Sequence, residues 1–504
     1  MTGRPVRAIA IVGGGTAGWI AASVLARALG PAGLFISLVE SPKIGTVGVG
    51  EATIPPILDL LRFLGINEKD FVRHTQATYK LGIKFQDWRR LGEAYWHPFG
   101  AFGTPIARRP FLNAFLAARA QDLPVRTDDY SVCAKLAEAG RFPDPAQMAS
   151  LGADFRYALH FDASLVADYL AAYAKHLGVR HIQAEVQDVH LDAHGYIAGL
   201  QLDSGETLAA DLFIDCSGFR GLLIEGALKT GYCDWSRHLP CNRAYAVQTA
   251  RQDPLAPYTL SRARTAGWTW RIPLQHRTGN GHVYCSDYIA DQTALDDLMA
   301  GLDGPPVTDP RLLRFTTGRR RKVWNKNCIA LGLAAAFLEP LESTSIHLVV
   351  SGVYNLLEHF PDLDFVPSNI DAYNAEIEAE LRSVRDFIIL HYKATERSDA
   401  PFWTHRREED IPDSLKQRID YFCSHGRLPT RAGELFTDQS WFWVLHGMGL
   451  QPERYDPLLD VVPQAQLSDI LAKLAAEVAG VVARAPLHAQ HFPRSAAFTA
   501  VEAQ

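Results

Sequence analysis

The 504-residue sequence lacks several features that would assign it to a specialised class. None of its apolar runs reaches the length of a membrane span, and its start has no signal-peptide layout, because the first apolar run leads straight into a glycine turn. The formal net charge of −6 gives no support for a nucleic-acid or anionic-membrane partner. We therefore expect a soluble globular protein whose partners include neither nucleic acid nor a membrane.

Cysteine is sparse and shows no pairing pattern. The seven cysteines are scattered, odd in number and without C-x-x-C spacing, which argues against a disulfide framework and against a zinc site. The sequence shows no metal-ligand cluster, no internal repeat and no low-complexity linker. These observations predict reduced thiols in a cytoplasmic protein without a metal.

The strongest motif that is present lies at the start of the chain. An apolar run at residues 9–12 leads into a G-x-G-x-x-G turn at residues 13–18, and a small-residue apolar segment follows. This order of strand, tight turn and helix binds the pyrophosphate of a dinucleotide at the helix N-terminus. A second apolar run ends on an acidic residue that is correctly spaced to bind a ribose hydroxyl. The residues expected to contact the dinucleotide here are Gly13, Gly15, Thr16, Ala17, Gly18 and Glu40.

The glycine turn belongs to a larger pattern. Segments 6–40, 211–218 and 328–337 each have an apolar strand followed by a small-residue turn, which is the arrangement of a two-segment FAD-binding fold. Strand patterns become rare after about residue 350, where helical periods dominate. We predict a mixed α/β body over residues 1–350, which includes a substrate-side sheet, and a mainly helical region over residues 351–504.

Periodicity predicts several further elements. Residues 95–100 are expected to form an aromatic loop, and the six basic residues between Arg311 and Lys322 a solvated segment. Helices are expected at 55–63, within 155–179, and late in the chain over 467–482. Strands are expected at 77–85, 182–189, 197–202, 212–214, 267–273 and 282–289.

The strand at residues 77–85 carries two lysines on one face, Lys80 and Lys84. Lysines that face a protein interior are costly unless they are functional. From the pattern alone, a solvated face on an edge strand is therefore favoured for both.

Several strings of residues together resemble the flavin-dependent tryptophan halogenase family. The most specific is W-x-W-x-I-P at residues 268–273, which occurs together with the glycine turn. The other strings lie at residues 48–53, 79–80, 215–221 and 337–344, in the order of the family. The resemblance covers about residues 5 to 350 and weakens beyond. It implies a Rossmann-type flavoprotein monooxygenase-like body that binds FAD as FADH2.

The resemblance also implies the reaction and its residues. FADH2 and O2 would oxidise chloride or bromide to hypohalous acid, which reaches Lys80 and halogenates an electron-rich aromatic ring. Lys80 matches the family's catalytic lysine, which overturns the solvated interpretation, whereas Lys84 has no match and is expected to be structural. Glu342 matches the carboxylate that faces this lysine, and its neighbour Ser343 is expected to assist. Halide is expected at Thr344 and Ser345, where many members have glycine at the second position.

Other matches imply cofactor and substrate contacts. Residues 45–51 match a strap over the flavin, and the expected cofactor contacts outside the glycine turn are Gly48, Val49, Gly50, Glu51, Ala52 and Leu333. Trp268 and Trp270 are expected to separate flavin from substrate, although plain core aromatics are an equally good interpretation. His97 and Phe99 match aromatic residues that line the substrate pocket.

The substrate and partners follow from the same resemblance. Members that bind free tryptophan hold its amino-acid end with a Tyr-Tyr pair and a following Glu, and this sequence contains no Tyr-Tyr. Indole, an indole derivative or a larger electron-rich arene is therefore expected. A separate flavin reductase is implied as the source of FADH2, and a homodimer is compatible with the sequence. Two alternatives stay open: a flavin monooxygenase that needs no halide, and a non-catalytic flavoprotein.

Overall fold

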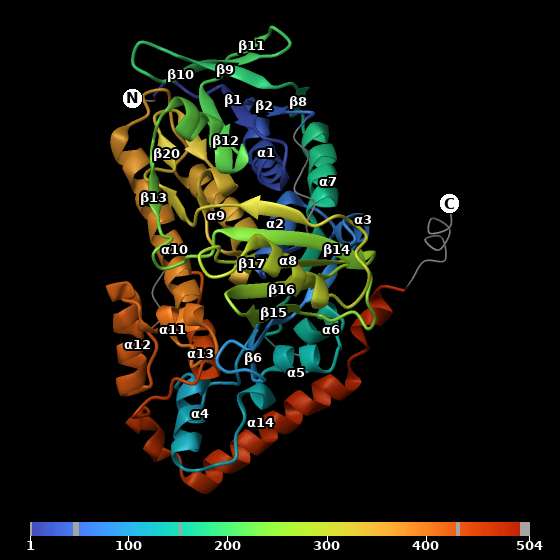
Figure 1. The fold of residues 1–504 in the computed structure, drawn as a ribbon, viewed down its shortest axis with the longest axis vertical. Coiled ribbons are helices and arrows are strands. Elements are labelled where there is room, and N and C mark those ends of the chain that lie inside the picture. The colour runs from blue at the N-terminus through green and yellow to red at the C-terminus, as the bar shows by residue number, and fades with distance from the viewer. Residues whose placement is uncertain (1–2, 44–49, 151–153, 430–433, 494–504) are drawn as a thin grey trace.

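The computed structural model describes residues 3–43, 50–150, 154–429 and 434–493 (Figure 1). Two large sheets organise this chain, and they lie one above the other in the view of Figure 1. In the first sheet, the glycine turn follows the carboxyl end of a central strand. The second sheet carries the W-x-W-x-I-P string. Helices from the C-terminal part of the chain cover one side and one end of the molecule.

The first sheet is six-stranded and parallel apart from β20 at its edge. Alternate residues of its central strand β1 face opposite sides, as the apolar run predicts. Ile9 and Ile11 join the large core that contains helix α1, whereas Ala10 and Val12 pack with the β9–β11 sheet on the other side. The strands in spatial order are β20 (Trp324–Asn325), β21 (Cys328–Ala330), β12 (Leu212–Asp215), β1 (Ala8–Val12), β2 (Phe35–Glu40) and β8 (Arg180–Gln183).

The second sheet is seven-stranded and mainly antiparallel. Its strands in spatial order are β18 (Arg311–Arg314), β14 (Arg243–Ala250), β17 (Arg277–Tyr284), β16 (Gly267–Pro273), β15 (Thr259–Arg264), β5 (Gly82–Gln86) and β6 (Ala94–Pro98). Three small sheets complete the strand structure of the described chain: β3 (Gly50–Ala52), β7 (Ala158–Asp162) and β4 (Thr78–Lys80); β11 (Thr207–Leu208), β10 (Ile197–Leu202) and β9 (Val186–Leu191); and β13 (Tyr232–Asp234), β19 (Gly318–Arg320) and β22 (Ala336–Phe337).

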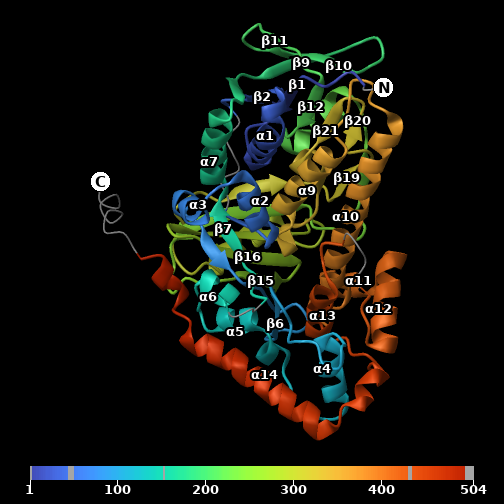
Figure 2. The ribbon, with the colours of Figure 1, turned by 180° about the vertical axis from the view of Figure 1, so that it is seen from behind.

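The helices fall into two groups along the chain, α1 to α8 among the strands and α9 to α14 after the last strand. In the first 350 residues α1 packs against α7 and against α9, which begins just before residue 350. Figure 2 shows α14 as a long arm at the end of the molecule opposite the first sheet. The helices are α1 (Thr16–Leu29), α2 (Pro56–Leu64), α3 (Glu68–His74), α4 (Phe111–Ala120), α5 (Val132–Glu138), α6 (Pro145–Ser150), α7 (Ala163–His176), α8 (Asp291–Ala300), α9 (Ser345–Glu358), α10 (Pro367–Lys393), α11 (Pro401–Glu408), α12 (Asp413–His425), α13 (Asp438–Gly447) and α14 (Gln464–Arg484).

The three strand-and-turn segments predicted from the sequence are confirmed, because β1, β12 and β21 lie side by side and parallel. The helices predicted at 55–63, within 155–179 and over 467–482 correspond to α2, α7 and α14. The strands predicted at 197–202, 212–214 and 267–273 correspond to β10, β12 and β16. Periodicity was sufficient here because each segment is long or strongly patterned.

The single strand predicted at residues 77–85 is wrong. The chain forms β4 and β5, which belong to different sheets and meet at Leu81. The Leu81 N–H donates to Pro257 O, and a Cβ on Gly82 would lie 2.6 Å from His97 O, so glycine is required at this crossing. Lys80 and Lys84 therefore do not share a face.

Other boundaries also differ from the prediction. The aromatic loop expected at residues 95–100 is largely strand β6, and the strand expected at 182–189 is divided into β8 and β9. The strand expected at 282–289 begins earlier, as β17, and ends at Tyr284. The solvated basic segment is wrong at Arg319 and Arg320, which are buried in ion pairs with Glu378 and Glu225, whereas the other four basic residues are exposed. Long-range pairing overrode the local pattern in each case.

All seven cysteines are free thiols. In the described part of the chain, no helix is both long and apolar enough to cross a bilayer. Among the same residues, no three His, Cys, Asp or Glu side chains gather in a way that could hold a metal ion.

Candidate active site

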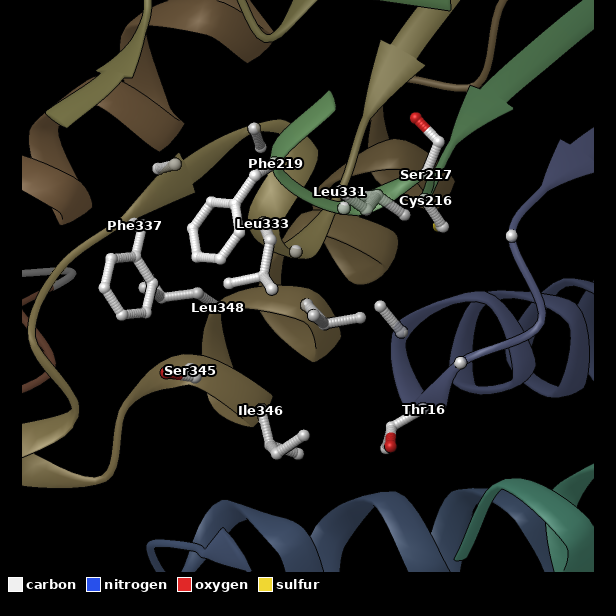
Figure 3. A pocket seen from close by; sticks show the side chains of 18 of the residues that line it. Thr16, Cys216, Ser217, Phe219, Leu331, Leu333, Phe337, Ser345, Ile346 and Leu348 are labelled. Atoms are coloured by element: carbon white, nitrogen blue, oxygen red, sulfur yellow. The ribbon is translucent and has the colours of Figure 1, made fainter. Parts of the chain in front are cut away.

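A cavity of about 760 Å³ lies at the carboxyl ends of β1, β12 and β21. Two helix N-termini reach it from different sides (Figure 3): Thr16 marks the start of α1, and Ser345 and Ile346 mark the start of α9. Ligands of parallel α/β sheets bind at this edge, and the free N–H groups of a helix N-terminus attract anions. The cavity thus offers two anion sites joined by a mainly apolar space.

The glycine turn has the shape that a pyrophosphate requires. Gly13 has a φ of +116°, and a Cβ on it would lie 2.3 Å from Cys216 O. A Cβ on Gly18 would lie 1.9 Å from Gly13 O, so only glycine allows α1 to start this close to the turn. By contrast, Gly15 has open space in front of it, and α1 has neither a capping side chain nor an acidic residue in its first turn. Its first N–H groups are therefore available to a phosphate.

The acidic residue predicted for the ribose is also in position. Glu40 ends β2, lines the cavity and folds over Gly14, where a Cβ would lie 2.1 Å from its Cδ. Its Oε2 is 2.9 Å from Nε2 of His181. The fit of turn, helix and carboxylate to FAD is thus supported by the structure itself. Further predicted contacts that line the cavity are Gly13, Gly15, Thr16, Ala17, Gly50, Glu51, Ala52 and Leu333.

The strap prediction falls partly outside the described residues, which exclude Gly48 and Val49. The strap's last residues form β3, which pairs with β7. Burial, with the nearby Asp162 charge, raises the pKa of the Glu51 carboxyl to about 7. Strand β3, at the end of the strap, thus lines the cavity and is held there by its pairing with β7.

The second helix N-terminus lies where the halide is predicted. Thr344 and Ser345 both line the cavity, and Thr344 makes no side-chain cap to α9. The N–H groups of the first turn of α9 are consequently free, and no acidic side chain occurs there to compete with an anion. This geometry suits a halide, although the assignment of Thr344 and Ser345 stays a prediction.

Lys80 lies directly behind this part of the cavity. Its side chain is fully buried, and Nζ donates to Thr53 O and to Ser343 Oγ, both at 2.9 Å. Ser343 also lines the cavity, so it stands between the cavity and the lysine. Burial lowers the pKa of the Lys80 ammonium to about 7, although the Glu342 charge opposes this shift. Near neutral pH, Lys80 therefore exists in both protonation states.

The side of the Lys80 Nζ that makes no hydrogen bond faces an aromatic ring, since Nζ lies 5.2 Å from the ring centroid of Phe99. In the neutral amine, two N–H bonds satisfy Thr53 and Ser343, which leaves the lone pair on this side. In the ammonium form, the same direction carries a third N–H donor. The predicted substrate residue Phe99 therefore lies beside the free side of Nζ.

Glu342 lies at the end of the short 3-10 turn Pro340–Glu342, immediately before Ser343. Its buried carboxylate accepts from two histidines: Oε2 is 2.8 Å from His97 Nδ1, and Oε1 is 2.8 Å from His391 Nε2. Burial alone would raise the pKa of Glu342, but His97 and His391 together lower it to about 2. The carboxylate is thus ionised at neutral pH.

The predicted substrate residues separate into two places. His97 and Phe99 lie on the Lys80 side, where His97 holds Glu342. Trp268 and Trp270 instead line the cavity from β16, and the Trp268 Nε1–H donates to the buried Glu339 at 2.9 Å. The four assignments stay predictions, and the two tryptophans line the large cavity, whereas His97 and Phe99 do not.

Two buried residues that contact predicted site residues were missed by sequence reasoning. His391 comes from α10, far along the chain from Glu342, and no local motif marks it. The one sequence feature that could have pointed to His391 is its position as a single histidine in the apolar run 387–392. Glu339, which is buried between Trp268 and Tyr392, belongs to the same string as Glu342 but was not assigned a role.

The comparison with protein families decides the classification. The model of the tryptophan halogenase family matches residues 8–464 of this chain. The chain belongs to this family. It is a flavin-dependent halogenase, an oxidoreductase that uses FADH2, O2 and a halide ion. The match also confirms the predicted α/β flavoprotein fold with a helical C-terminal part.

Individual relatives of this halogenase support the assignment. It is 36% identical to "Tryptophan 7-halogenase RebH" of Lentzea aerocolonigenes, over 92% of this chain and 93% of RebH. Among solved structures, it resembles the flavin-dependent halogenase Xcc4156 of Xanthomonas campestris, with a TM-score of 0.93, 44% identity, and coverage of 97% of this chain and 98% of Xcc4156. BrvH, a flavin-dependent halogenase from Brevundimonas sp. BAL3, aligns with a TM-score of 0.92 and 42% identity, over 96% of this chain and 98% of BrvH.

Proposed function

We propose that this halogenase uses Lys80 and Glu342 to transfer a halogen from hypohalous acid to an electron-rich arene such as indole. The observation that carries the proposal is the position of Ser343. It lines the flavin cavity, and its hydroxyl accepts a hydrogen bond from the buried Lys80. Hypohalous acid formed in the cavity therefore has a short polar route to Lys80.

FAD would be held by the glycine turn, the start of α1 and Glu40, and in its reduced form with O2 it supplies the oxidant for the halide. The chain's own contribution begins with the halide. Free N–H groups at the start of α9 hold the anion beside the cavity. The apolar side chains of Phe219, Phe337 and Leu348 line this end of the cavity (Figure 3).

Lys80 then acts on the hypohalous acid. Its free N–H donates to the hydroxyl oxygen, which turns hydroxide into a better leaving group as the halogen–oxygen bond breaks and the carbon–halogen bond forms. The departing hydroxide takes a proton from the ammonium and leaves as water. A pKa near 7 suits this proton transfer, because the ammonium gives up its proton readily at neutral pH.

Glu342 completes the reaction as a general base. Once the ring carries both hydrogen and halogen, its carboxylate removes the ring proton and restores aromaticity. The hydrogen bonds from His97 and His391 keep the carboxylate ionised and fix its direction. Substituting Glu342 with glutamine should remove the base; the amide oxygen can still accept from one histidine, whereas the amide NH2 cannot accept from the other.

The aromatic side chains around Glu342 suit an apolar, flat substrate. His97 is near Phe387 and Phe436, whose rings stack at 3.9 Å, and Trp441 lies edge-on to Phe387 at 4.8 Å. Aromatic rings bind an arene by stacking. The sequence has no Tyr-Tyr pair to hold an amino-acid end. We therefore propose indole or a larger indole derivative in preference to free tryptophan.

An assay with FAD, a flavin reductase, bromide and either indole or free tryptophan tests the substrate proposal by mass spectrometry. We expect halide-dependent product from indole at a kcat/KM at least 10-fold above that for tryptophan. A preference for tryptophan would contradict the substrate class. Hydroxylated product in halide-free buffer would instead favour a monooxygenase, and the absence of product from indole and from a panel of phenols and pyrroles a non-catalytic flavoprotein.

The reduced thiols of the chain support a cytoplasmic location, which fractionation of the native cells tests. The homodimer stays a prediction that sedimentation velocity tests directly.

A further inference from the structure

The two histidines that bind Glu342 have different surroundings. His391 is fully buried, and both of its ring nitrogens have a partner. Nε2 is 2.8 Å from Glu342 Oε1, and Nδ1 is 2.7 Å from the Tyr95 hydroxyl. The imidazole of His391 therefore lies between a carboxylate and a phenol.

The chemistry of these two partners defines where the proton sits on His391. An ionised carboxylate only accepts hydrogen bonds, so Nε2 must carry the proton that points to Glu342. On the other side, burial and the Glu342 charge raise the pKa of the Tyr95 phenol well above its usual value, so its hydroxyl keeps its proton. No other hydrogen-bond acceptor contacts this hydroxyl among the described residues, which leaves Nδ1 of His391 as its acceptor.

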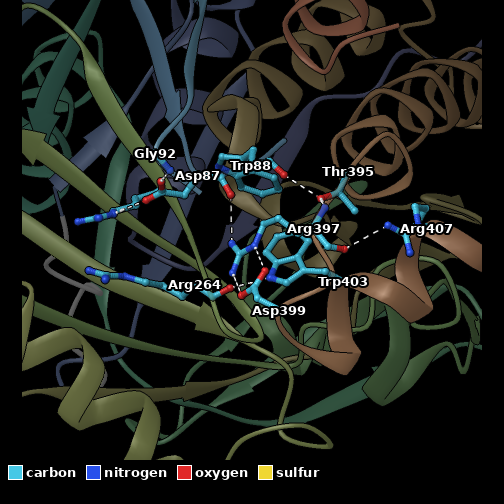
Figure 4. Close-up of polar contacts among 10 residues, drawn as sticks. Asp87, Trp88, Gly92, Arg264, Thr395, Arg397, Asp399, Trp403 and Arg407 are labelled. Atoms are coloured by element: carbon cyan, nitrogen blue, oxygen red, sulfur yellow. Dashed lines mark hydrogen bonds and ion pairs between the residues drawn. The ribbon is translucent and has the colours of Figure 1, made fainter. Parts of the chain in front are cut away.

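The packing around His391 prevents the ring from turning over. Phe85 stacks on it with a centroid distance of 4.6 Å and an interplanar angle of 25°, and Trp88 meets it edge-on at 5.7 Å. Trp88 is itself held in place (Figure 4): its carbonyl accepts from Thr395, and the neighbouring Asp87 carbonyl accepts from Arg397. The ring nitrogens therefore keep their partners.

We propose that Tyr95 is a positioning residue that, together with Glu342, holds His391 as a neutral imidazole with its proton on Nε2. His391 then fixes the direction of the Glu342 carboxylate without carrying the arene proton. The inference rests on the proposed role of Glu342 as the base. Burial also lowers the pKa of His391, which disfavours a second proton. The titratable groups that face this carboxylate are His97 and Tyr95 from β6, His391 from α10, and Lys80 from β4.

Glutamine at position 391 separates positioning from proton transfer. Its amide N–H can donate to Glu342 and its amide oxygen can accept from Tyr95, as the neutral imidazole does, but it cannot carry a proton. We expect His391→Gln to keep kcat within about 10-fold of the wild type with an unchanged pH profile. His391→Leu, which leaves the carboxylate without this donor, should lose about 100-fold in kcat.

The state of His391 is measured directly by ¹⁵N NMR of the flavin-free protein labelled at histidine, with His391→Gln used to assign the signal. We expect a protonated Nε2 and an unprotonated Nδ1 that do not change between pH 6 and pH 9. In Tyr95→Phe, the Nδ1 signal should shift downfield because its hydrogen bond is lost. Tyr169→Phe is the matched control, since that hydroxyl donates to Asp70 on α3 and should leave the His391 signal unchanged.

Three results would overturn the inference: an imidazolium or an Nδ1-protonated ring in the wild type, an Nδ1 signal that ignores Tyr95→Phe, or a His391→Gln enzyme as inactive as His391→Leu. The NMR result on the wild type stands even where a variant fails to fold. Failure of the proposed function has a different signature, because Glu342→Gln would then halogenate at the wild-type rate whatever the state of His391.

Discussion

At the scale of single residues, Lys80 combines a charge with complete burial. Its ammonium has two neutral acceptors, Thr53 O and Ser343 Oγ, and no ion pair within 4.0 Å among the described residues. Transferring a cation from water into such a place is costly, which is why its pKa falls to about 7. The same depressed pKa that suits proton transfer should therefore reduce the stability of the fold.

Replacing Lys80 with methionine should show both effects. The folded pKa is about 7 and the unfolded value 10.5, so the unfolded chain binds more protons between these two pH values and wild-type stability rises with pH in that range. Below pH 7, burial of the charged lysine reduces the free energy of unfolding by its full amount. This amount is roughly 1.4 kcal/mol for each unit by which the pKa is lowered, before solvent and structural relaxation. Lys80→Met should thus melt at a higher temperature than the wild type at pH 6, while halogenation falls at least 100-fold.

Calorimetry at pH 6 and pH 9 checks this prediction, with Lys84→Met as the control. Lys84 lies on β5 with its Nζ 5.3 Å from the Trp96 ring centroid, away from the Lys80 acceptors. A stability gain that is equal at both pH values, or that Lys84→Met reproduces, would contradict the account of Lys80.

The residues of the site differ in how far the sequence could predict them. Lys80, Ser343 and Glu342 were assigned through strings of neighbouring residues, and the structure brings Lys80 and Ser343 into contact. His391 and Tyr95 could not be assigned, because their roles arise from side-chain contacts between α10 and β6 that leave no local pattern. A buried network of this kind requires the tertiary structure.

At the scale of elements, the halide is predicted at the start of α9, where the helix has no side-chain cap and no acidic residue in its first turn. A carboxylate at its first position would occupy the same N–H groups as the anion, although it would favour the helix itself. Ser345→Asp should therefore raise the KM for halide at least 10-fold without lowering the melting temperature. Initial rates at several bromide concentrations measure this effect.

The neutral variant Ser345→Asn is the control for the size of the side chain. Its KM for halide should stay within about 3-fold of the wild-type value, because the N–H groups stay free. An equal rise in both variants would indicate a steric effect instead of a halide site.

Strand β4, which carries Lys80, is held by the end of the chain. Nε2 of the buried His488 accepts from the Tyr79 N–H at 3.2 Å, and its Nδ1 donates to Leu255 O at 3.0 Å. Removing this side chain leaves two buried backbone groups unpaired, so His488→Ala should reduce the free energy of unfolding by about 2 to 4 kcal/mol. Urea unfolding measures it, with the exposed His74→Ala as the control, for which a change above about 0.5 kcal/mol would be unexpected.

Helices and strands could be predicted from the sequence where a single hydrophobic period runs through the whole segment, as in α7, α14 and β16. The break between β4 and β5 was not, because alternation continues through Leu81 while the hydrogen-bond partners change sheet. The buried arginines of β19 were missed for a related reason, since their carboxylate partners lie far away in the sequence. The division of the chain near residue 350 stays a prediction, and α9 runs through that position.

At the scale of the whole molecule, one cavity extends from the dinucleotide turn to Ser343, whose hydroxyl contacts Lys80. The glycine turn is the one dinucleotide motif found in the sequence, and the halogenase family depends on a separate flavin reductase. NADH and FAD alone should therefore give no halogenated product. Adding a reductase, or FAD reduced by light, should restore product formation, which mass spectrometry measures.

Product formation from NADH and FAD without a reductase would contradict this division of labour between two proteins. Such a result would require a second nucleotide site that delivers hydride within this chain.

In the proposed reaction, hypohalous acid leaves the flavin cavity past Ser343 and is used at Lys80. The most direct test supplies FADH2, O2 and bromide to the wild type and to Lys80→Ala, with indole and a dye that reacts with free hypobromite. The account predicts bromoindole of one regiochemistry and little dye bromination from the wild type. It predicts from Lys80→Ala a loss of that product together with increased dye bromination, because the oxidant still forms but escapes. Unchanged bromoindole formation by Lys80→Ala would contradict it.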